Sequence, residues 1–256
     1  MKVVADLEGN GLLQDITKIH CLCLIDIDTE VVYEYADTDN YRSIADGLLH
    51  LSDCSSVVFH FGEKYDLPVI EKLYPGWKRP ARALDSFILA RLMWPDRMAL
   101  DRPLVAKGTL PSRLMGNHSL ESYGYRLGVL KGDYDKGDAS VWDHWTPEMH
   151  SYMVQDTKVL LALYRHLQAH KKLTTAMAVE VEHDASRVCA LIEQTGFPID
   201  LEMAEKKIVF NADGAPQDIQ NRERFDAHKL IEVGVPVVAV RFAGTIHDFV
   251  MLSPIA

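Results

Sequence analysis

The sequence predicts an α/β protein in which helices flank a mixed β-sheet. Strand-like runs come first in the chain, helical runs with an interleaved strand follow, and two long helical segments lie after residue 146. Hydrophobic residues make up 48% of the 256 residues and charged residues 25%, as is typical of a globular protein. A chain of this length can hold one full α/β domain and a modest appendage.

Short apolar or alternating runs predict the strands. Val3–Ala5 is apolar throughout, and this indicates a buried strand. Lys18–Asp26 and Glu30–Tyr35 alternate on either side of the polar turn Asp28-Thr29, which favours a hairpin. Ser56–Phe59 is again short and apolar, so it predicts a further buried strand.

The predicted helices share apolar residues spaced three or four apart. They lie at Tyr41–Leu51 (with Ile44, Leu48 and Leu51 on one side), Asp66–Leu73, Asp85–Trp94, Pro147 to about His170, and Thr174 to about Thr195. Thr146 and Pro147 form a typical helix start, and Gly196 a typical helix end. Residues 95–117 predict a long exposed loop, because prolines and glycines interrupt them, and its basic residues are Arg97, Arg102, Lys107 and Arg113.

The last part of the chain has a weaker pattern. Leu201–Phe210 predicts the start of another helix, and from Asn211 onward no strong period persists apart from a short β-prone run, LIEVGVPVVAV. We therefore expect one domain over residues 1–200, followed by a C-terminal helix and tail of uncertain structure over residues 201–256.

Charge is distributed unevenly in this chain of net charge −10. Residues 1–63 carry 3 basic and 12 acidic side chains, whereas residues 64–131 carry 12 basic and 6 acidic ones. A basic segment beside acidic ones suits an enzyme with an acidic metal-binding cleft and a basic approach to it. From charge alone, a solvated charged surface is the favoured interpretation.

Cysteine spacing and hydropathy indicate the cellular location of the protein. No C-x-x-C spacing occurs, so we expect reduced core thiols and neither a zinc site nor disulfides for Cys21, Cys23, Cys54 and Cys189. No apolar run approaches the roughly 20 residues of a membrane span. The N-terminus lacks the hydrophobic region of a signal peptide. We therefore expect a cytoplasmic protein without a membrane partner.

Asp6 and Glu8 are the first acids that need an explanation. They follow an apolar run and stand two residues apart, so on a strand both side chains point to one face. Two carboxylates about 4 Å apart repel one another by roughly 4 kcal/mol at a dielectric of about 20, and burial adds to this cost unless a cation lies between them. The acid-x-acid spacing recurs elsewhere, for example at Asp26 and Asp28, so spacing alone favours a pair without a metal.

Two further acids stand in apolar surroundings. Tyr152 and Asp156 are four residues apart and share a face of the predicted helix from Pro147, where a hydrogen bond between them is the alternative to a metal site. Asp66 follows Tyr65 at the end of a predicted strand segment, and a cap on the helix that starts there is its default interpretation.

Together these segments resemble the three motifs of the DEDD-type 3′–5′ exonucleases, in the variant with a tyrosine four residues before the last aspartate. The chain is similar, more closely, to the proofreading domain of the family A DNA polymerases of short-tailed phages. The resemblance extends in order over about residues 1–209, through FHFGEKYDLPVI, ALDSFILARL, GNHSLESYGYRLGVLKGDY, YMVQD and EQTGFPID. It implies a ribonuclease H-like fold, which agrees with the element order predicted above.

The resemblance implies a metal-binding role for each acid. Asp6, Glu8 and Asp156 would ligate one Mg²⁺ that holds the attacking water, and Asp6 would bridge to a second Mg²⁺ held by Asp66. Oxygen ligands alone suit Mg²⁺, or Mn²⁺ in its place, and not zinc. Tyr152 would position the water through a hydrogen bond, because a phenol with a pKa near 10 is a poor base at neutral pH.

The resemblance also points to side chains that would contact the substrate. The candidates lie in the first two motifs and are Asn10, Leu12, Leu13, His60 and Phe61. The two leucines are candidates to wedge against the terminal base, and core leucines are the alternative interpretation. Phe61 departs from the family, which usually has asparagine there, and this puts rate or substrate preference in doubt.

The C-terminal part is the larger departure from the family. After GFPID the polymerases continue into a thumb and a polymerising palm, whereas this chain runs into NADGAPQDIQ, so we expect no nucleotide incorporation. A native cap, a docking segment for a separately encoded polymerase and the remnant of a split gene are the alternatives for this tail.

Three hypotheses for the function follow. The first is a 3′–5′ exonuclease that acts on single-stranded DNA 3′ ends, alone or as the editing part of a split phage polymerase. The second is the same chemistry on short RNA. The third is a non-catalytic DNA-binding or assembly module, which the retained acids argue against.

Overall fold

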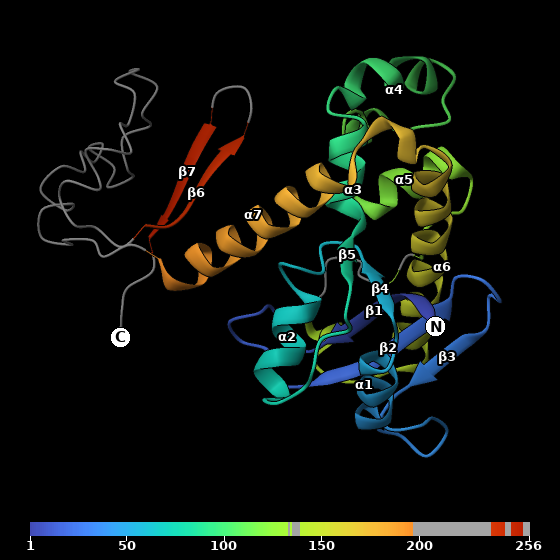
Figure 1. Ribbon diagram of the computed structural model, residues 1–256, viewed down its shortest axis with the longest axis vertical. Helices are drawn as coiled ribbons and strands as arrows, with labels where there is room; N and C mark the ends of the chain where they lie inside the picture. The colour runs from blue at the N-terminus through green and yellow to red at the C-terminus, as the bar shows by residue number, and fades with distance from the viewer. Residues whose placement is uncertain (133, 135–138, 197–236, 244–246, 253–256) are drawn as a thin grey trace, which may run out of the picture. The chain divides into compact units, whose positions relative to one another are not determined.

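Five strands pair into one mixed sheet in the computed structural model, which describes residues 1–132, 134, 139–196, 237–243 and 247–252 (Figure 1). The strands are β1 (Lys2–Gly9), β2 (Ile19–Asp26), β3 (Val32–Tyr35), β4 (Ser56–Phe59) and β5 (Ala83–Asp85). Their order is β3-β2-β1-β4-β5, antiparallel among β1, β2 and β3 and parallel from β1 through β4 to β5. This confirms the predicted mixed sheet and its ribonuclease H-like class; strand β5 was not predicted.

The predicted helices mostly begin and end where the sequence places them. The described helices are α1 (Ile44–Ser52), α2 (Asp66–Leu73), α3 (Ser86–Met93), α4 (Arg97–Ala106), α5 (Leu120–Leu127), α6 (Pro147–Ala169) and α7 (Ala176–Thr195), with short 3₁₀ turns at Ser112–Leu114, Ala139–Trp142 and Lys171–Leu173. Helices α4 and α5 were not predicted. Thr146 caps α6 by accepting a hydrogen bond from the Met149 amide, as predicted. Helix α1 starts after Ser43, later than predicted, because the Ser43 side chain caps the amide of Asp46.

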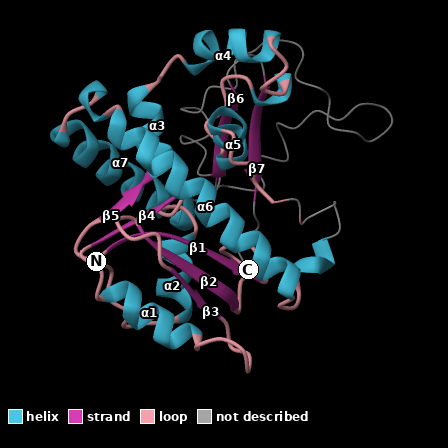
Figure 2. Ribbon diagram, turned by 90° about the vertical axis from the view of Figure 1, so that its right-hand side faces the viewer, coloured by secondary structure: helices cyan, strands magenta, loops and turns pink. Residues whose placement is uncertain are grey.

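Alternation along β1 separates the two faces of the sheet. Val3, Ala5 and Leu7 pack with residues of α1 and α2 in one core. Val4 belongs to the opposite core, which α6 supplies with buried residues such as Met153 and Leu160. Figure 2 shows α6 crossing one face of the sheet, with α1 and α2 on the other. Asp6 and Glu8 share the parity of Val4, so β1 presents them to α6.

The predicted loop over residues 95–117 is wrong, because part of it is helical. Residues Arg97–Ala106 form α4 despite Pro103, and Asp101 within it is fully buried. Its carboxylate accepts hydrogen bonds from Arg126 and from the Gly116 amide, at 2.6 and 2.9 Å, and pairs with Arg97 at 3.2 Å. These charged contacts over-ride the proline and glycine signals, which are local only.

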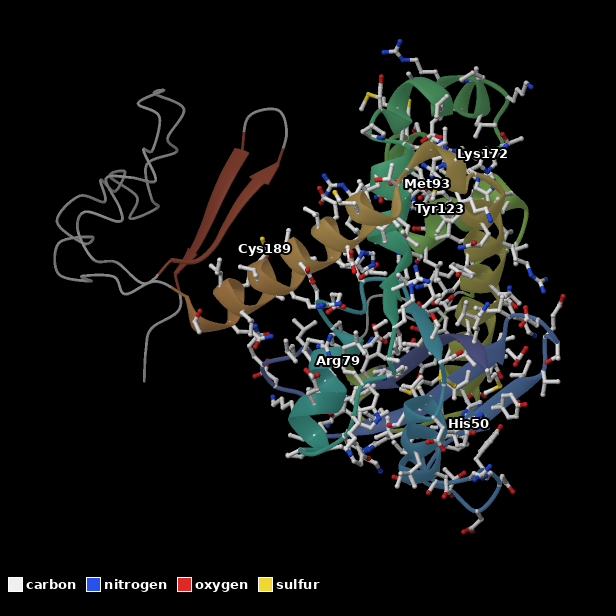
Figure 3. The ribbon with its side chains drawn as sticks, in the orientation of Figure 1. His50, Arg79, Met93, Tyr123, Lys172 and Cys189 are labelled. Carbon is white, nitrogen blue, oxygen red and sulfur yellow. The ribbon has the colours of Figure 1, made fainter. Side chains whose placement is uncertain are left out.

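The cysteines correct one further prediction. All four are free, and Cys21, Cys23 and Cys54 are buried core thiols as predicted. Cys189, on α7, is exposed, so its predicted placement in the core was wrong (Figure 3).

The chain divides into two compact units, Met1–Arg187 and Val188–Ala256. In the second, β6 (Val237–Ala243) and β7 (His247–Leu252) pair antiparallel. The predicted helix at Leu201–Phe210 and most of the predicted tail lie outside the described residues. Among the described helices, none combines the length and the apolar character needed to cross a membrane.

Candidate active site

Three of the predicted acids meet where α6 crosses β1. Asp6 and Glu8 lie on β1, opposite Cys23 and Cys21 of β2, and are half-buried. Asp156 of α6 is buried at 2% exposure and lies over the same face. One carboxylate oxygen from each residue lies within 4.8 Å of the others. The sheet parity and the helix register therefore bring together residues that are 148 positions apart in the chain.

Like charges and burial make this cluster costly without a cation. Burial raises the pKa of Glu8 to about 8, and the carboxylates of Asp156 and Asp66 add to the rise, although Lys131 opposes it. The pKa of Asp6 is raised well above its ordinary value by burial and then by Glu8, Asp66 and Asp156. Near neutral pH, the cluster therefore holds protons that an incoming cation would displace.

Lys131 is a site residue that the motifs did not single out. Its ammonium lies 2.6 Å from Oδ2 of Asp156 and 4.9 Å from the ring centroid of Tyr152. Burial disfavours its charge, but Asp156 and Tyr152 outweigh this and raise the pKa of Lys131, so it stays protonated. The cluster thus contains one built-in positive charge.

The geometry of Asp156 tests whether a divalent cation fits. Its Oδ1 is buried and has no hydrogen-bond partner among the described residues, whereas Lys131 and the Tyr152 hydroxyl bond to its carboxylate. An unpaired buried carboxylate oxygen beside two further carboxylates is costly unless a cation is present. Oxygen donors alone are the ligand set of Mg²⁺ or Mn²⁺, so the residues fit such an ion.

Tyr152 lies one helical turn before Asp156, as predicted. Its hydroxyl hydrogen-bonds to both Lys131 and Asp156. Burial, reinforced by Asp156, raises its pKa, so the hydroxyl stays protonated at neutral pH and can donate. A Cβ placed on Gly132 would lie 2.9 Å from Cδ2 of Tyr152, so the backbone after Lys131 approaches this ring too closely for a larger residue.

Asp66 stands apart from the cluster of three acids. It is the first residue of α2, and the cap position belongs to Tyr65, which makes no side-chain capping bond. Its default interpretation as a helix cap is therefore wrong. Burial raises the pKa of Asp66 to about 8, although the hydrogen bonds that its carboxylate accepts from the amides of Asp66 and Leu7 lower it. The charge of Asp66 also raises the pKa of Asp6. The position suits a further oxygen ligand at the edge of the cluster.

The loop after β1 holds one exposed leucine on a fixed backbone. Asn10 accepts from the amides of Thr17 and Lys18 at 3.0 Å each, so its side chain closes the loop. Tyr65 donates to the Gly11 carbonyl at 2.7 Å and further ties the loop to the second motif. Leu12 is 72% exposed, which rules out the core interpretation for it, whereas the neighbouring Leu13 packs partly against the core.

His60 and Phe61 precede Asp66 in an aromatic group. His60 donates to or accepts from Ser86 at 2.8 Å, and burial, with Lys131 and His118, lowers its pKa to about 3, so it is neutral. Phe61 is 38% exposed, and its ring centroid lies 4.0 Å from that of Phe87. Substrate contact by these residues, and by Asn10, Leu12 and Leu13, stays a prediction.

Comparison with known proteins gives the class. The chain is 31% identical over 244 aligned residues to the DNA-directed DNA polymerase of Escherichia phage T7, with 81% of this chain covered, and equally to that of Enterobacteria phage T3. It spans about a third (34%) of the length of these curated relatives. No family model matches the chain.

Solved structures give weaker likenesses. Brucella melitensis NrnC has a TM-score of 0.47 at 15% identity, with 75% of this chain and 80% of that chain covered. Exonuclease X in complex with 5′ overhanging duplex DNA has a TM-score of 0.42 at 15% identity, with 72% and 99% covered. Escherichia coli RNase D has a TM-score of 0.43 at 14% identity, with 73% and 45% covered. At these scores, no property of those proteins transfers to this one.

The chain therefore belongs to the family of the phage DNA polymerases, and in this region it carries the motifs that resemble those of the DEDD-type nucleases. It is homologous to the DNA polymerases of phages T7 and T3.

Proposed function

We propose that this protein is a metal-dependent 3′–5′ exonuclease that removes nucleotides from single-stranded or frayed DNA 3′ ends. The observation that carries the proposal is the meeting of Asp6, Glu8 and Asp156 within 4.8 Å, with Oδ1 of Asp156 left unpaired among the described residues. Homology to DNA polymerases supports DNA over RNA as the substrate.

The residues divide the work of phosphodiester hydrolysis. Asp6, Glu8 and Asp156 would hold one Mg²⁺, and Asp6 with Asp66 a second. When bound, such ions lower the pKa of the attacking water and stabilise charge on the leaving 3′ oxygen. The Tyr152 hydroxyl stays protonated and orients the water by a hydrogen bond. Lys131 holds Oδ2 of Asp156 and keeps a positive charge where the anionic phosphate would approach.

The loop over residues 10–17 supplies a contact for the end of the strand. Leu12 is exposed on a backbone fixed by Asn10 and Tyr65, so it would press against the terminal base without the loop having to reorder. This suits removal of a terminal nucleotide, and hence a proofreading role in the cytoplasm of a phage host. The protein would act alone or with a separately encoded polymerase.

Degradation of labelled oligonucleotides tests the proposal. A 5′-labelled single-stranded DNA with Mg²⁺ should yield a ladder of shortened products, and Asp6→Asn/Glu8→Gln should abolish it. The matched control is Asp28→Asn/Asp39→Asn, which removes two exposed acids of the same segment, outside the loop over residues 10–17, and should leave the ladder intact. An RNA oligonucleotide of the same sequence should be degraded more slowly. No products from the wild type with Mg²⁺ or Mn²⁺ would refute the proposal.

A further inference from the structure

The turn that carries Asp66 into the site has a strained backbone. Phe61, between β4 and α2, has φ of +68°, a left-handed conformation that side chains other than glycine, asparagine and aspartate rarely adopt. Lys64 and Tyr65 both donate their amides to the Phe61 carbonyl, so the following residues wind directly into α2. A strained turn persists only when surrounding contacts over-determine it. Those contacts therefore decide where Asp66 lies.

Asp85, at the end of β5, makes the first set of contacts to this turn. Its Oδ1 accepts from the Phe61 amide at 3.1 Å and its Oδ2 from the Glu63 amide at 3.4 Å. The same carboxylate caps α3 through the Phe87 amide at 2.8 Å. Asp85 is 3% exposed, so these bonds are shielded from water. One buried carboxylate thus joins the turn to a strand and to a helix.

Helix α7 holds Asp85 in turn. The Asp85 amide donates to Nε2 of His183 at 2.8 Å. The other ring nitrogen of His183, Nδ1, lies 2.7 Å from the Val179 carbonyl and must donate to it. This fixes the neutral tautomer whose Nε2 accepts. A histidine more than 110 residues after the second motif therefore completes the hydrogen bonding of its turn.

A second contact from α7 reaches the turn through Glu63, which is 2% exposed. Nε of Arg187 lies 3.2 Å from its Oε1, and Nη1 of Arg79 lies 3.0 Å from its Oε2. Arg79 also bonds to Glu71 of α2 at 3.1 Å, and Figure 3 labels it close to that helix. The buried carboxylate is thus compensated from two sides, and one side is α7.

We propose that His183 and Arg187 are positioning residues: through Asp85 and Glu63 they hold the left-handed turn at Phe61 and so place the Asp66 carboxylate for a divalent cation. The inference rests on the metal site of the proposed function. Neither residue belongs to the acid-bearing motifs, and neither touches Asp6, Glu8 or Asp156 in any contact described above. They act on the edge of the cluster that Asp66 occupies.

Calorimetric titration of DNA-free protein with Mn²⁺, beside thermal melting, tests this. His183→Phe removes the acceptor for the Asp85 amide and should weaken Mn²⁺ binding at the Asp66 side roughly tenfold. His183→Gln restores an acceptor and should bind nearly as the wild type does. Arg187→Met should weaken binding in the same direction, whereas Asp184→Asn removes only the exposed partner of Arg187 and should change nothing. The Mg²⁺ concentration for half-maximal degradation should follow the same order.

Phe61→Asn separates a positioning role from a merely structural one. Asparagine tolerates the left-handed turn, so adding it to His183→Phe should recover most of the Mn²⁺ affinity. Wild-type Mn²⁺ affinity in both His183→Phe and Arg187→Met would overturn the inference, even if melting temperature falls. So would a loss that Phe61→Asn does not recover. If Mn²⁺ binding follows this order but the protein does not degrade DNA, the proposed function would be refuted, whereas the positioning role of His183 and Arg187 would be supported.

Discussion

Two acids of the site are held in opposite ways. Asp156 lies on the continuous helix α6 and is fixed directly, by an ion pair of 2.6 Å with Lys131. Asp66 begins a short helix after a strained turn; its carboxylate meets the neutral amides of Asp66 and Leu7, and Asp85 and Glu63 hold the turn before it. The Lys131 ammonium competes with a metal ion for the Asp156 carboxylate. The contacts at the turn before Asp66 place its carboxylate without competing for it. Mutations on the two sides should therefore move metal affinity in opposite directions.

Lys131→Met should give the largest effect. Removing the ammonium frees Asp156 for a cation, so Mn²⁺ should bind the DNA-free protein more tightly, while degradation of DNA falls roughly 100-fold because the carboxylate and the phosphate lose their positive partner. Calorimetry and a degradation assay measure the two quantities. Lys158→Met, which removes an exposed lysine from α6, the helix that carries Asp156, is the matched control. Weaker Mn²⁺ binding in Lys131→Met would contradict the difference drawn between the Asp156 side and the Asp66 side of the site.

The pH dependence of stability should report the acid cluster. The pKa values of Glu8 and Asp66 rise on folding from 4.5 and 3.8 to about 8, so between these values the folded state holds more protons than the unfolded state. The free energy of unfolding of the metal-free protein should therefore fall, by up to about 1.4 kcal/mol per pH unit for each of the two groups, as pH rises from about 4 to about 8. Denaturant titrations at several pH values measure it. Adding Mn²⁺, or substituting Glu8→Gln/Asp66→Asn, should make the free energy of unfolding depend less on pH. The same pH dependence with and without these changes would contradict the cost assigned to the acid cluster.

Gly132→Ala should have an intermediate effect, confined to Tyr152 and Asp156 on α6. The new methyl group would meet the Tyr152 ring at 2.9 Å, and moving that ring should lower the degradation rate about tenfold and stability by about 1 kcal/mol. In a Tyr152→Ala background the same substitution should cost nothing more, since the clash is gone. Equal losses in both backgrounds would mean that the glycine serves another purpose.

Leu12→Ala should have the smallest effect, because the side chain is 72% exposed. Melting temperature should not change, and neither should the degradation of single-stranded DNA. Degradation from a paired end should slow about threefold, which corresponds to about 0.7 kcal/mol, as the wedge is lost. Leu49→Ala, at a residue 67% exposed on α1, is the control. Equal rates on paired ends for both variants would exclude the wedge.

The sequence predicted the side of the site around Asp6, Glu8 and Asp156 better than the side around Asp66. Period-two alternation put Asp6 and Glu8 on one face of β1, and the four-residue spacing put Tyr152 above Asp156, since both are properties of a single element. Lys131 could not be predicted, because it follows α5 without periodic signal and acts only through tertiary contact. The residues that hold the Phe61 turn were missed for the same reason, because Asp85 lies on β5 whereas His183 and Arg187 lie on α7.

Local signals also misled where charge decided the structure. Prolines in residues 95–117 predicted a loop, yet the buried Asp101 with Arg126 holds α4 in place. The Phe61 departure indicated a change in rate or substrate preference, and the structure adds a strained φ that the chain must hold. In both cases the missing information is which charged partner lies nearby, and residue patterns do not carry it.

The central claim is that the acid cluster is a site for divalent cations, in which Lys131 supplies the charge when none is bound. Anomalous diffraction from crystals soaked in Mn²⁺ tests it most directly. We expect a peak among the carboxylates of Asp6, Glu8 and Asp156, and a second beside Asp66 that weakens in His183→Phe. No peak at a saturating concentration of Mn²⁺, with the Lys131 ammonium still paired to Asp156, would contradict the account.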